Sequence, residues 1–223
     1  MFGPIMQVRV GKLTIRLAPF AREDMGEFIN NGGMQSHLTT RYLGRRISPT
    51  LEDEQEWFDR IRKDSARIAW GVWDVSPEGT PVLIGGSDLM NIVHDPLHQA
   101  TSGSLIFRRE YWGQGIATAI HKARTWYAFN ELGLVRIKSA VMLPNIGSRK
   151  ALERCGYFQH SIERNVKFSD GRLVHQENLE CLNPSDAAWS LWWGSDEPSK
   201  LALSARAVTQ EALAWASEHV TFE

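Results

Sequence analysis

The sequence predicts a mixed α/β fold in which strands outnumber helices and hairpins accompany one strand–helix–strand unit. Stretches of alternating polar and apolar residues, the period of a half-buried strand, recur along the chain. Turn residues separate several of these stretches, with Pro77-Glu78-Gly79 in the first half and the hairpin-favouring pair Asp170-Gly171 in the second. One long helical segment lies between two strands from residue 115 onwards. A doubly wound sheet is therefore not expected.

The first half of the chain predicts four strands and two helices. Lys12 to Ala18 alternates as a strand, and Pro19 limits it. A helix is expected from Thr50, a good N-cap residue that acids follow in the first turn. The expected strands are 12–18, 67–75, 81–91 and 100–107, and the expected helices are 20–30 and 50–64.

The second half predicts the strand–helix–strand unit and a returning hairpin. Apolar residues recur at helical spacing after Gly115, and Gly133 is well placed as the residue that ends this helix. A shorter helix begins at Asn145 and is closed by Gly156. The expected helices are 115–132 and 145–155, and the expected strands are 134–141, 157–168 and 172–182.

Residues 184–223 predict a helical extension to a main domain that covers residues 1–183. Two helices are expected, at 185–193 and 199–220. Trp189, Trp192 and Trp193 fall at i, i+3 and i+4, on one face of the first helix, and Trp215 adds a fourth tryptophan. Because an exposed face of this size would drive association, the extension is expected to pack on the domain or on a second subunit of a homodimer.

The overall composition excludes several classes of protein. With 25 basic and 26 acidic side chains the net charge is -1, so no basic excess exists to attract nucleic acid. Cys155 and Cys181 are the two cysteines, which gives neither a disulfide framework nor metal-ligand spacing. No stretch approaches the roughly 20 apolar residues of a membrane span. A soluble, cytoplasmic protein is expected.

The most informative segment joins a strand to the N-terminus of the long helix, and it reads Trp112-Gly113-Gln114-Gly115-Ile116-Ala117. Glycines let the backbone approach a ligand closely, and the unpaired N–H groups of a first helical turn suit a phosphate or pyrophosphate. No Gly-Lys-Ser/Thr follows, which excludes a Walker A loop. Thr118 stands where a dinucleotide fingerprint needs Gly or Ala.

This segment resembles the acetyl-coenzyme A signature [Q/R]-x-x-G-x-[G/A] of the GNAT acyltransferase superfamily, with Trp112 in place of the usual Gln or Arg. The tryptophan variant is similar to the branch that contains ribosomal-protein N-terminal acetyltransferases. A second block agrees: Asn145-Ile146-Gly147-Ser148 followed by Gly156-Tyr157 resembles the N-x-x-S…G-[FY] helix of that branch. The resemblance covers residues 13–182 and implies a mixed, mainly antiparallel sheet flanked by helices.

The resemblance also implies roles for individual residues, with acetyl-CoA as co-substrate. The strand end would pair with the pantetheine arm and polarise the thioester, and it comprises Leu105, Ile106 and Phe107. Backbone amides would hold the pyrophosphate at Gly113, Gln114, Gly115, Ile116, Ala117 and Thr118. Asn145 would contact the cofactor, although it is also a good N-cap residue. Ser148 is the candidate general acid for the leaving thiolate, or else bonds to its own helix backbone.

No general base follows from the sequence. The strand before the glycine segment contains no acid, so Ser102 or Ser104 would act through an ordered water, and Asp88, His175 and Glu177 on other strands are alternatives. Cys155 matches a core position on a helix face. His94, Asp95 and His98 lie in an expected loop without the pattern of a further ligand, so no metal site is predicted.

The function predicted from these observations is an acetyl-CoA-dependent N-acetyltransferase. A primary amine, from a protein N-terminus or a small molecule, would attack the thioester directly, without an acyl-enzyme. Two alternatives that also use acyl-CoA remain, which are the transfer of a longer acyl group and a non-catalytic acyl-CoA sensor. A third interpretation, a nucleic-acid-modifying subunit, would need a basic patch that only folding could assemble.

Overall fold

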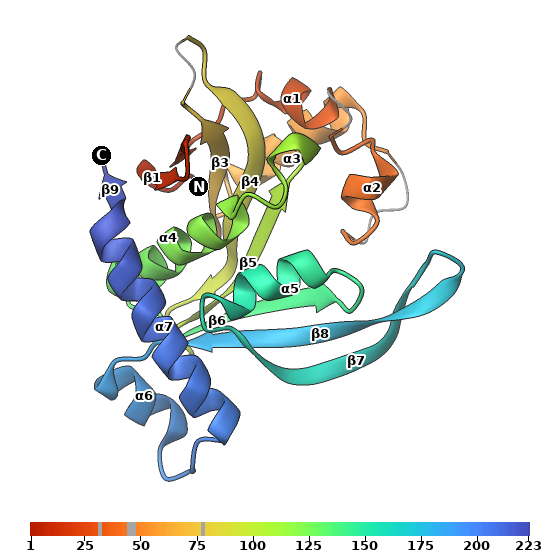
Figure 1. Ribbon diagram of the computed structural model, residues 1–223. Helices are drawn as coiled ribbons and strands as arrows, with labels where there is room; N and C mark the ends of the chain where they lie inside the picture. The colour runs from red at the N-terminus through yellow and green to blue at the C-terminus, as the bar shows by residue number, and fades with distance from the viewer. Residues whose placement is uncertain (31–32, 44–47, 77–78) are drawn as a thin grey trace. The chain divides into compact units, whose positions relative to one another are not determined.

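The computed structural model describes residues 1–30, 33–43, 48–76 and 79–223. The expected turn at Pro77-Glu78 lies outside the described residues. The chain forms two compact units (Figure 1). The first unit comprises Met1–Met90, Gly103–Ile116 and Val220–Glu223, and the second comprises Asn91–Ser102 and Ala117–His219.

The first unit is built on an antiparallel sheet. Hydrogen bonds place its strands in the order β9-β1-β2-β3-β4, and the C-terminal part of β5 follows β4. The bounds are β1 Met6–Val10, β2 Leu13–Ala18, β3 Ile68–Asp74, β4 Val82–Val93, β5 Gln99–Ile106 and β9 Val220–Phe222. Strands β4 and β5 each begin in one unit and end in the other.

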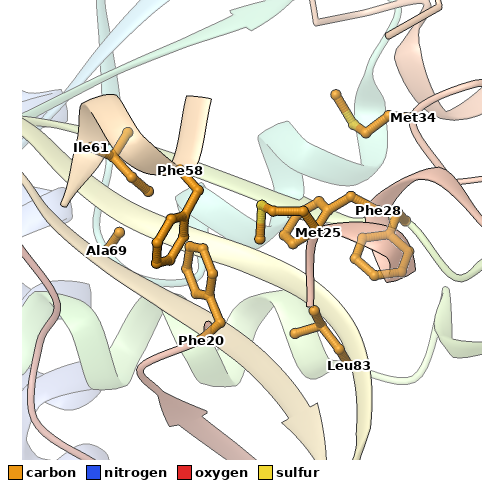
Figure 2. Close-up of a cluster of buried hydrophobic side chains, with 9 residues drawn as sticks. Phe20, Met25, Phe28, Met34, Phe58, Ile61, Ala69 and Leu83 are labelled. Carbon is orange, nitrogen blue, oxygen red and sulfur yellow. The ribbon is translucent and has the colours of Figure 1, made fainter. Parts of the chain in front are cut away.

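Helices α1 Met25–Ile29, α2 His37–Thr40 and α3 Leu51–Ile61 belong to the same unit. Helix α3 begins where the sequence predicts, because Thr50 and Asp53 form a reciprocal capping box. Figure 2 shows the apolar cluster of this unit. Its buried members are Phe20, Met25, Phe28, Met34, Phe58, Ile61, Ala69, Leu83 and Phe107.

The second unit has its own strand order, β7-β8-β6, followed by the N-terminal part of β5. Its elements are α4 Ile116–Asn130, which starts at the end of the first unit, β6 Arg136–Met142, α5 Ile146–Glu153, β7 Phe158–Ser169 and β8 Arg172–Leu182. The pairs β7–β8 and β6–β8 are antiparallel. Strands β5 and β6 pair in parallel over three positions, from Gln99↔Arg136 to Thr101↔Lys138. Helix α4 connects these two strands.

Helices α6 Asp186–Trp193 and α7 Lys200–His219 lie side by side in the second unit (Figure 1). The Arg206 guanidinium of α7 donates to the Pro184 carbonyl and to Asp186, at 2.8 and 2.7 Å. Trp189 is buried in a cluster with Phe158 and Leu182 of the sheet and with two alanines of α7. At Gly156 the backbone lies so close to α7 that an added Cβ would overlap the Thr209 hydroxyl.

The predicted fold class, a mixed and mainly antiparallel sheet flanked by helices, is confirmed. Two expected helices differ from the structure. The helix expected at 20–30 shortens to α1, because the Asp24 carboxylate accepts from the Ala21 amide and forms a local turn instead. The helix expected at 199–220 ends at His219, because Val220–Phe222 pair with β1 as strand β9. Strand β1 and helix α2 were not among the expected elements.

Candidate active site

The glycine turn begins at the end of β5, in the first unit. Phe107 is buried against Phe28, with ring centroids 4.9 Å apart, and its amide donates to the Ile84 carbonyl at 3.0 Å. The Trp112 indole N–H donates to the Ile106 carbonyl at 2.8 Å. The tryptophan that replaces the usual Gln or Arg of the signature therefore ties the turn back to the strand.

Two further side chains hold the turn in place. Arg108 donates to the Leu83 carbonyl and pairs with Glu27, at 2.9 and 2.6 Å. The Tyr111 hydroxyl donates to Asp74 at 3.0 Å, and burial together with this carboxylate raises the pKa of Tyr111 to about 12. The turn is thus fixed to neighbouring strands before any ligand arrives.

The glycines of the turn adopt backbone angles that other residues rarely adopt. Gly113 has φ of 75° and Gly115 has φ of 85°, in the left-handed region. A Cβ on Gly113 would meet nothing within 4 Å, and one on Gly115 would meet only Val10, at 3.8 Å. Helix α4 starts directly afterwards at Ile116. Open space beside a helix start with N–H groups that need partners fits the pyrophosphate of a coenzyme A.

The remaining predicted ligand residues lie in the second unit. Ala117 and Thr118 belong to the first turn of α4. Asn145 is the N-cap of α5, where its side-chain oxygen accepts from the Ser148 amide at 3.3 Å. Ser148 is half-buried in the first turn of α5. Cys155 lies in the core as expected, and burial raises the pKa of its thiol to about 12.

A cavity of about 250 Å³ lies in the first unit. Its walls combine aromatic and apolar side chains with two acids and two serines. The described lining residues are Phe20, Phe28, Met34, Leu43, Glu54, Trp57, Ala69, Trp70, Gly86, Ser87, Asp88, Gly103, Ser104 and Leu105. The cavity therefore reaches the strand segment that leads into the glycine turn.

Asp88 belongs to strand β4, and its carboxylate lies beside Gly103 of the neighbouring strand β5. A Cβ on Gly103 would come within 2.5 Å of the Asp88 carboxylate, so a side chain at position 103 would displace this carboxylate. Beside it, the hydroxyls of Ser87 and Ser104 are 3.1 Å apart, within hydrogen-bond distance. The arrangement brings a carboxylate and two hydroxyls together on one wall of the cavity.

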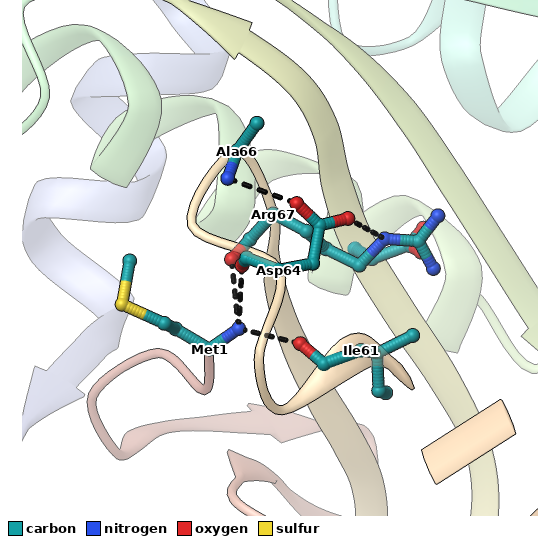
Figure 3. A network of polar contacts seen from close by, with 6 residues as sticks. Met1, Ile61, Asp64, Ala66 and Arg67 are labelled. Carbon is teal, nitrogen blue, oxygen red and sulfur yellow. Dashed lines mark hydrogen bonds and ion pairs between the residues drawn. The ribbon is translucent and has the colours of Figure 1, made fainter. Parts of the chain in front are cut away.

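Arg67 forms an ion pair with the Asp88 carboxylate. Its guanidinium is 3.3 Å from the Asp88 carboxylate and 3.7 Å from Asp64, whose side chain also accepts from the Ala66 amide (Figure 3). The Met1 amino group donates to the carbonyls of Ile61, Asp64 and Arg67 (Figure 3). This network fixes the backbone from which Arg67 extends.

The five candidates for the general base lie in different units, two in the first and three in the second. Asp88 and Ser104 line the cavity of the first unit. In the second unit, Ser102 accepts from the Tyr157 hydroxyl at 3.4 Å, the His175 ring accepts from the Asn165 amide at 3.1 Å, and Glu177 pairs with Arg149 at 3.3 Å. Glu54, which also lines the cavity, was not among the predicted site residues. Its position on the buried face of the amphipathic helix α3 could have indicated it.

Comparison with known proteins identifies the family. The sequence model of the acetyltransferase (GNAT) domain matches residues 14–157, well over half of the chain. The protein belongs to the GNAT acetyltransferase family. A Bacillus subtilis protein described as a probable N-acetyltransferase, YjcK, is 35% identical over 132 residues, which are 59% of this chain and 70% of that protein. The GNAT chain is accordingly an acyltransferase.

Solved structures share its fold. RimJ of Mycobacterium smegmatis, in complex with CoA-disulfide, has a TM-score of 0.68 at 18% identity and covers 85% of this chain and 93% of its own. A spermidine N-acetyltransferase of Vibrio cholerae, in complex with CoA and spermine, has a TM-score of 0.64 at 22% identity, over 77% of this chain and 95% of its own. At these identities the likeness shows the GNAT fold alone.

Within residues 1–30, 33–43, 48–76 and 79–223, no group of three or more His, Cys, Asp or Glu side chains is arranged to hold a metal ion. Among the helices of the described chain, none has both the length and the apolar character needed to cross a bilayer.

Proposed function

We propose that this GNAT protein is an acetyl-CoA-dependent N-acetyltransferase that acetylates a primary amine bound in the cavity of the first unit. One observation carries the proposal: the Asp88 carboxylate lies over Gly103 on β5, in a cavity bordering the strand that leads into the glycine turn. A proton acceptor on β4 thus lies beside the neighbouring strand β5, which leads into the candidate donor site.

The acetyl donor binds along that strand and turn. The amides of Gly113–Thr118 hold the pyrophosphate at the positive end of the α4 macrodipole. By the family resemblance, the backbone of Leu105, Ile106 and Phe107 would pair with the pantetheine arm, and Asn145 would contact the cofactor. The complexes of M. smegmatis RimJ and of the V. cholerae enzyme with CoA ligands support this choice of donor.

The reaction is a direct transfer between two substrates. Asp88, with Ser87 and Ser104 beside it, takes a proton from the incoming ammonium group. The neutral amine attacks the thioester carbonyl, a C–N bond forms, and the C–S bond breaks. Ser148 donates a proton to the departing thiolate and regains one as the new amide nitrogen loses its extra proton, while Asp88 releases the first proton to solvent. Arg67 acts as a positioning residue, because it holds the Asp88 carboxylate at 3.3 Å.

An amine screen tests the proposal against the two alternatives. The purified protein is incubated with acetyl-CoA and a panel of primary amines, free thiol is monitored, and products are identified by mass spectrometry. We expect release of CoA with at least one amine, with a matching N-acetylated product. A protein that binds acetyl-CoA but releases no thiol with any amine would be an acyl-CoA sensor. Release only from longer acyl-CoA donors would indicate transfer of a longer acyl group.

A further inference from the structure

Both acids that line the cavity of the first unit already have partners. The Asp88 carboxylate is 3.3 Å from the Arg67 guanidinium, and Glu54 also has an interaction partner. Among the described lining residues no other side chain is ionisable. Since neither acid offers an unpaired charge, the selectivity of this cavity has to come from the shape and the apolar surface of its walls.

Three aromatic rings form one wall of the cavity. Phe20 follows strand β2, Phe28 belongs to α1 and Trp57 belongs to α3. The centroid distances are 6.1 Å for Phe20–Phe28, 6.0 Å for Phe20–Trp57 and 6.1 Å for Phe28–Trp57. Each lies within the range of about 4.5–7 Å in which aromatic pairs are favourable. Figure 2 shows two of these rings, Phe20 and Phe28, with the cavity residues Met34 and Ala69.

The polar side chains of the cavity, apart from Glu54 of α3, lie on two strands. Ser87 and Asp88 belong to β4 and Ser104 belongs to β5, and the two serine hydroxyls are 3.1 Å apart. The strands therefore supply the hydrogen-bonding groups, and the helices supply apolar surface. A ligand with one polar and one apolar end matches this division, because a few polar groups orient a ligand in a largely apolar pocket.

The volume of the cavity, about 250 Å³, limits the size of the ligand. An apolar protein cavity of about 150 Å³ is large enough to bind benzene, so this volume holds a benzene-sized ring together with a short aminoalkyl chain. Sites for drug-sized ligands have roughly 300–1,000 Å³, which indicates a small acceptor here. A ligand ring gains aromatic contacts in addition to the free energy of leaving water.

We propose that this cavity binds a small primary monoamine whose apolar end is a benzene-sized aromatic ring. The ring lies among Phe20, Phe28 and Trp57, and the reacting nitrogen lies toward the serine hydroxyls of β4 and β5. The inference rests on the proposed function, since it names the acceptor class of the same site. The three rings determine specificity, because they contact the part of the acceptor that does not react.

The first experiment compares 2-phenylethylamine with ethylamine, which lacks the ring, and with 1,4-diaminobutane, which has a second charge in place of the ring. Initial rates are measured at saturating acetyl-CoA. We expect kcat/KM for 2-phenylethylamine to exceed that of either other amine by at least about tenfold, since even one methylene in an apolar pocket changes kcat/KM by about 10–200-fold. A smaller preference, or the reverse order, overturns the inference.

Substitutions at Gly86 of β4 narrow the cavity. A Cβ on Gly86 would meet ring atoms of Phe28 at 3.7 Å, an ordinary van der Waals contact, so alanine fits without displacing the ring. Gly86→Ala and Gly86→Val should reduce the preference for 2-phenylethylamine over ethylamine stepwise, and valine should raise KM for 2-phenylethylamine at least about tenfold. Gly26→Val in α1 is the matched control and should keep the wild-type preference. Gly26 is not among the described lining residues, and its Cβ would meet the Asn30 side chain at 3.6 Å.

Calorimetric titration of 2-phenylethylamine, at saturating CoA, separates the inference from the proposed function. Binding that Gly86→Val weakens at least about tenfold supports the cavity assignment even if no amine releases CoA, an outcome that overturns only the proposed function. No measurable binding to the wild-type protein, or an unchanged affinity in the folded Gly86→Val variant, overturns the inference and leaves the acetyltransferase to the amine screen. Melting temperatures show whether each variant is folded, and Gly86→Ala replaces the valine variant if that variant unfolds.

Discussion

The two units of this GNAT protein bury polar side chains in different ways. In the first unit, Glu54 and Asp88 border a cavity. In the second unit, Arg124 is fully buried in helix α4, and its guanidinium is 2.8 Å from the His121 ring nitrogen. Burial and the neighbouring Arg124 charge lower the pKa of His121 well below its usual value, so the neutral ring accepts from the arginine.

The difference teaches that burial of a polar group is not by itself a sign of function. His121 and Arg124 pair with one another within packed side chains. Asp88 also has a partner, Arg67, but it lines a cavity together with Glu54. Substitutions of buried side chains that pack only against one another, such as His121, should therefore change stability. Substitutions of residues that line the cavity or the proposed cofactor site should change catalysis or binding. The following predictions test this division.

The largest effect is expected from truncation after Asn183. This removes α6, α7 and β9, with the buried Trp189 and the α7 face that contacts Gly156. Since one tryptophan buries about 150–250 Å², we expect a loss of several kcal/mol of stability, together with lost activity or a changed oligomeric mass. Thermal melting, light scattering and kinetics measure this. The same melting temperature, mass and kinetics in the truncated protein would show that the extension is dispensable.

Gly115→Asp should reduce acetyl-CoA affinity by more than about 100-fold. A carboxylate at the helix start repels the pyrophosphate. The open space around Gly115 accommodates the side chain, and the backbone strain at this positive φ is shared by the control below. Calorimetric titration of the folded variant measures the effect. Gly115→Asn is the matched control, because asparagine tolerates the positive φ of 85° and carries no charge. Unchanged affinity in the aspartate variant would remove the turn from the cofactor site.

Asp88→Asn should lower kcat by about 10²-fold, because the amide cannot accept the proton of the incoming ammonium. The melting temperature is measured as well, because the substitution also removes the Asp88–Arg67 ion pair. His175→Gln tests the rival base in the second unit and should keep wild-type turnover, because the His175 ring already accepts from the Asn165 amide. The opposite pattern would move the general base from Asp88 to His175.

Ser148→Ala should lower kcat and kcat/KM together by about tenfold, with little change in acetyl-CoA affinity. The reason is that the hydroxyl protonates the departing thiolate. The Asn145 cap uses the Ser148 backbone amide, which alanine retains, so α5 should stay intact. A loss confined to acetyl-CoA affinity would indicate a binding role, and wild-type turnover would exclude both roles.

The smallest effect concerns His121 and pH. Because its folded pKa lies below the unfolded value of about 6.5, the unfolded chain binds more protons as the pH falls. Stability contributed by the neutral ring is therefore present above about pH 6.5 and decreases by up to about 1.4 kcal/mol per pH unit below it. Denaturant unfolding at pH 7.5 and 5.5 measures this slope. His121→Gln should reduce the slope, whereas His160→Gln, at an exposed site, should not.

Features that depend on short stretches of chain were predictable. The glycine turn, the Thr50 capping box and the Asn145 cap each use residues within a few positions of one another, and the structure has the helices they predict. Local patterns failed where a distant partner decided the outcome. Val220–Phe222 continue a helical sequence but form β9, because strand β1 offers them backbone hydrogen bonds across more than 200 residues.

The sequence by itself determined the order of most elements, the family signature and the candidate donor turn, because periodicity, capping and turn chemistry act over a few residues. Tertiary structure alone decided that Asp88 and Ser104 share a cavity with Glu54, while Ser102, His175 and Glu177 have partners in the second unit. The physical reason is that the cavity is assembled from residues between Phe20 and Leu105, and only the packing of α1, α3 and the central strands brings their side chains together.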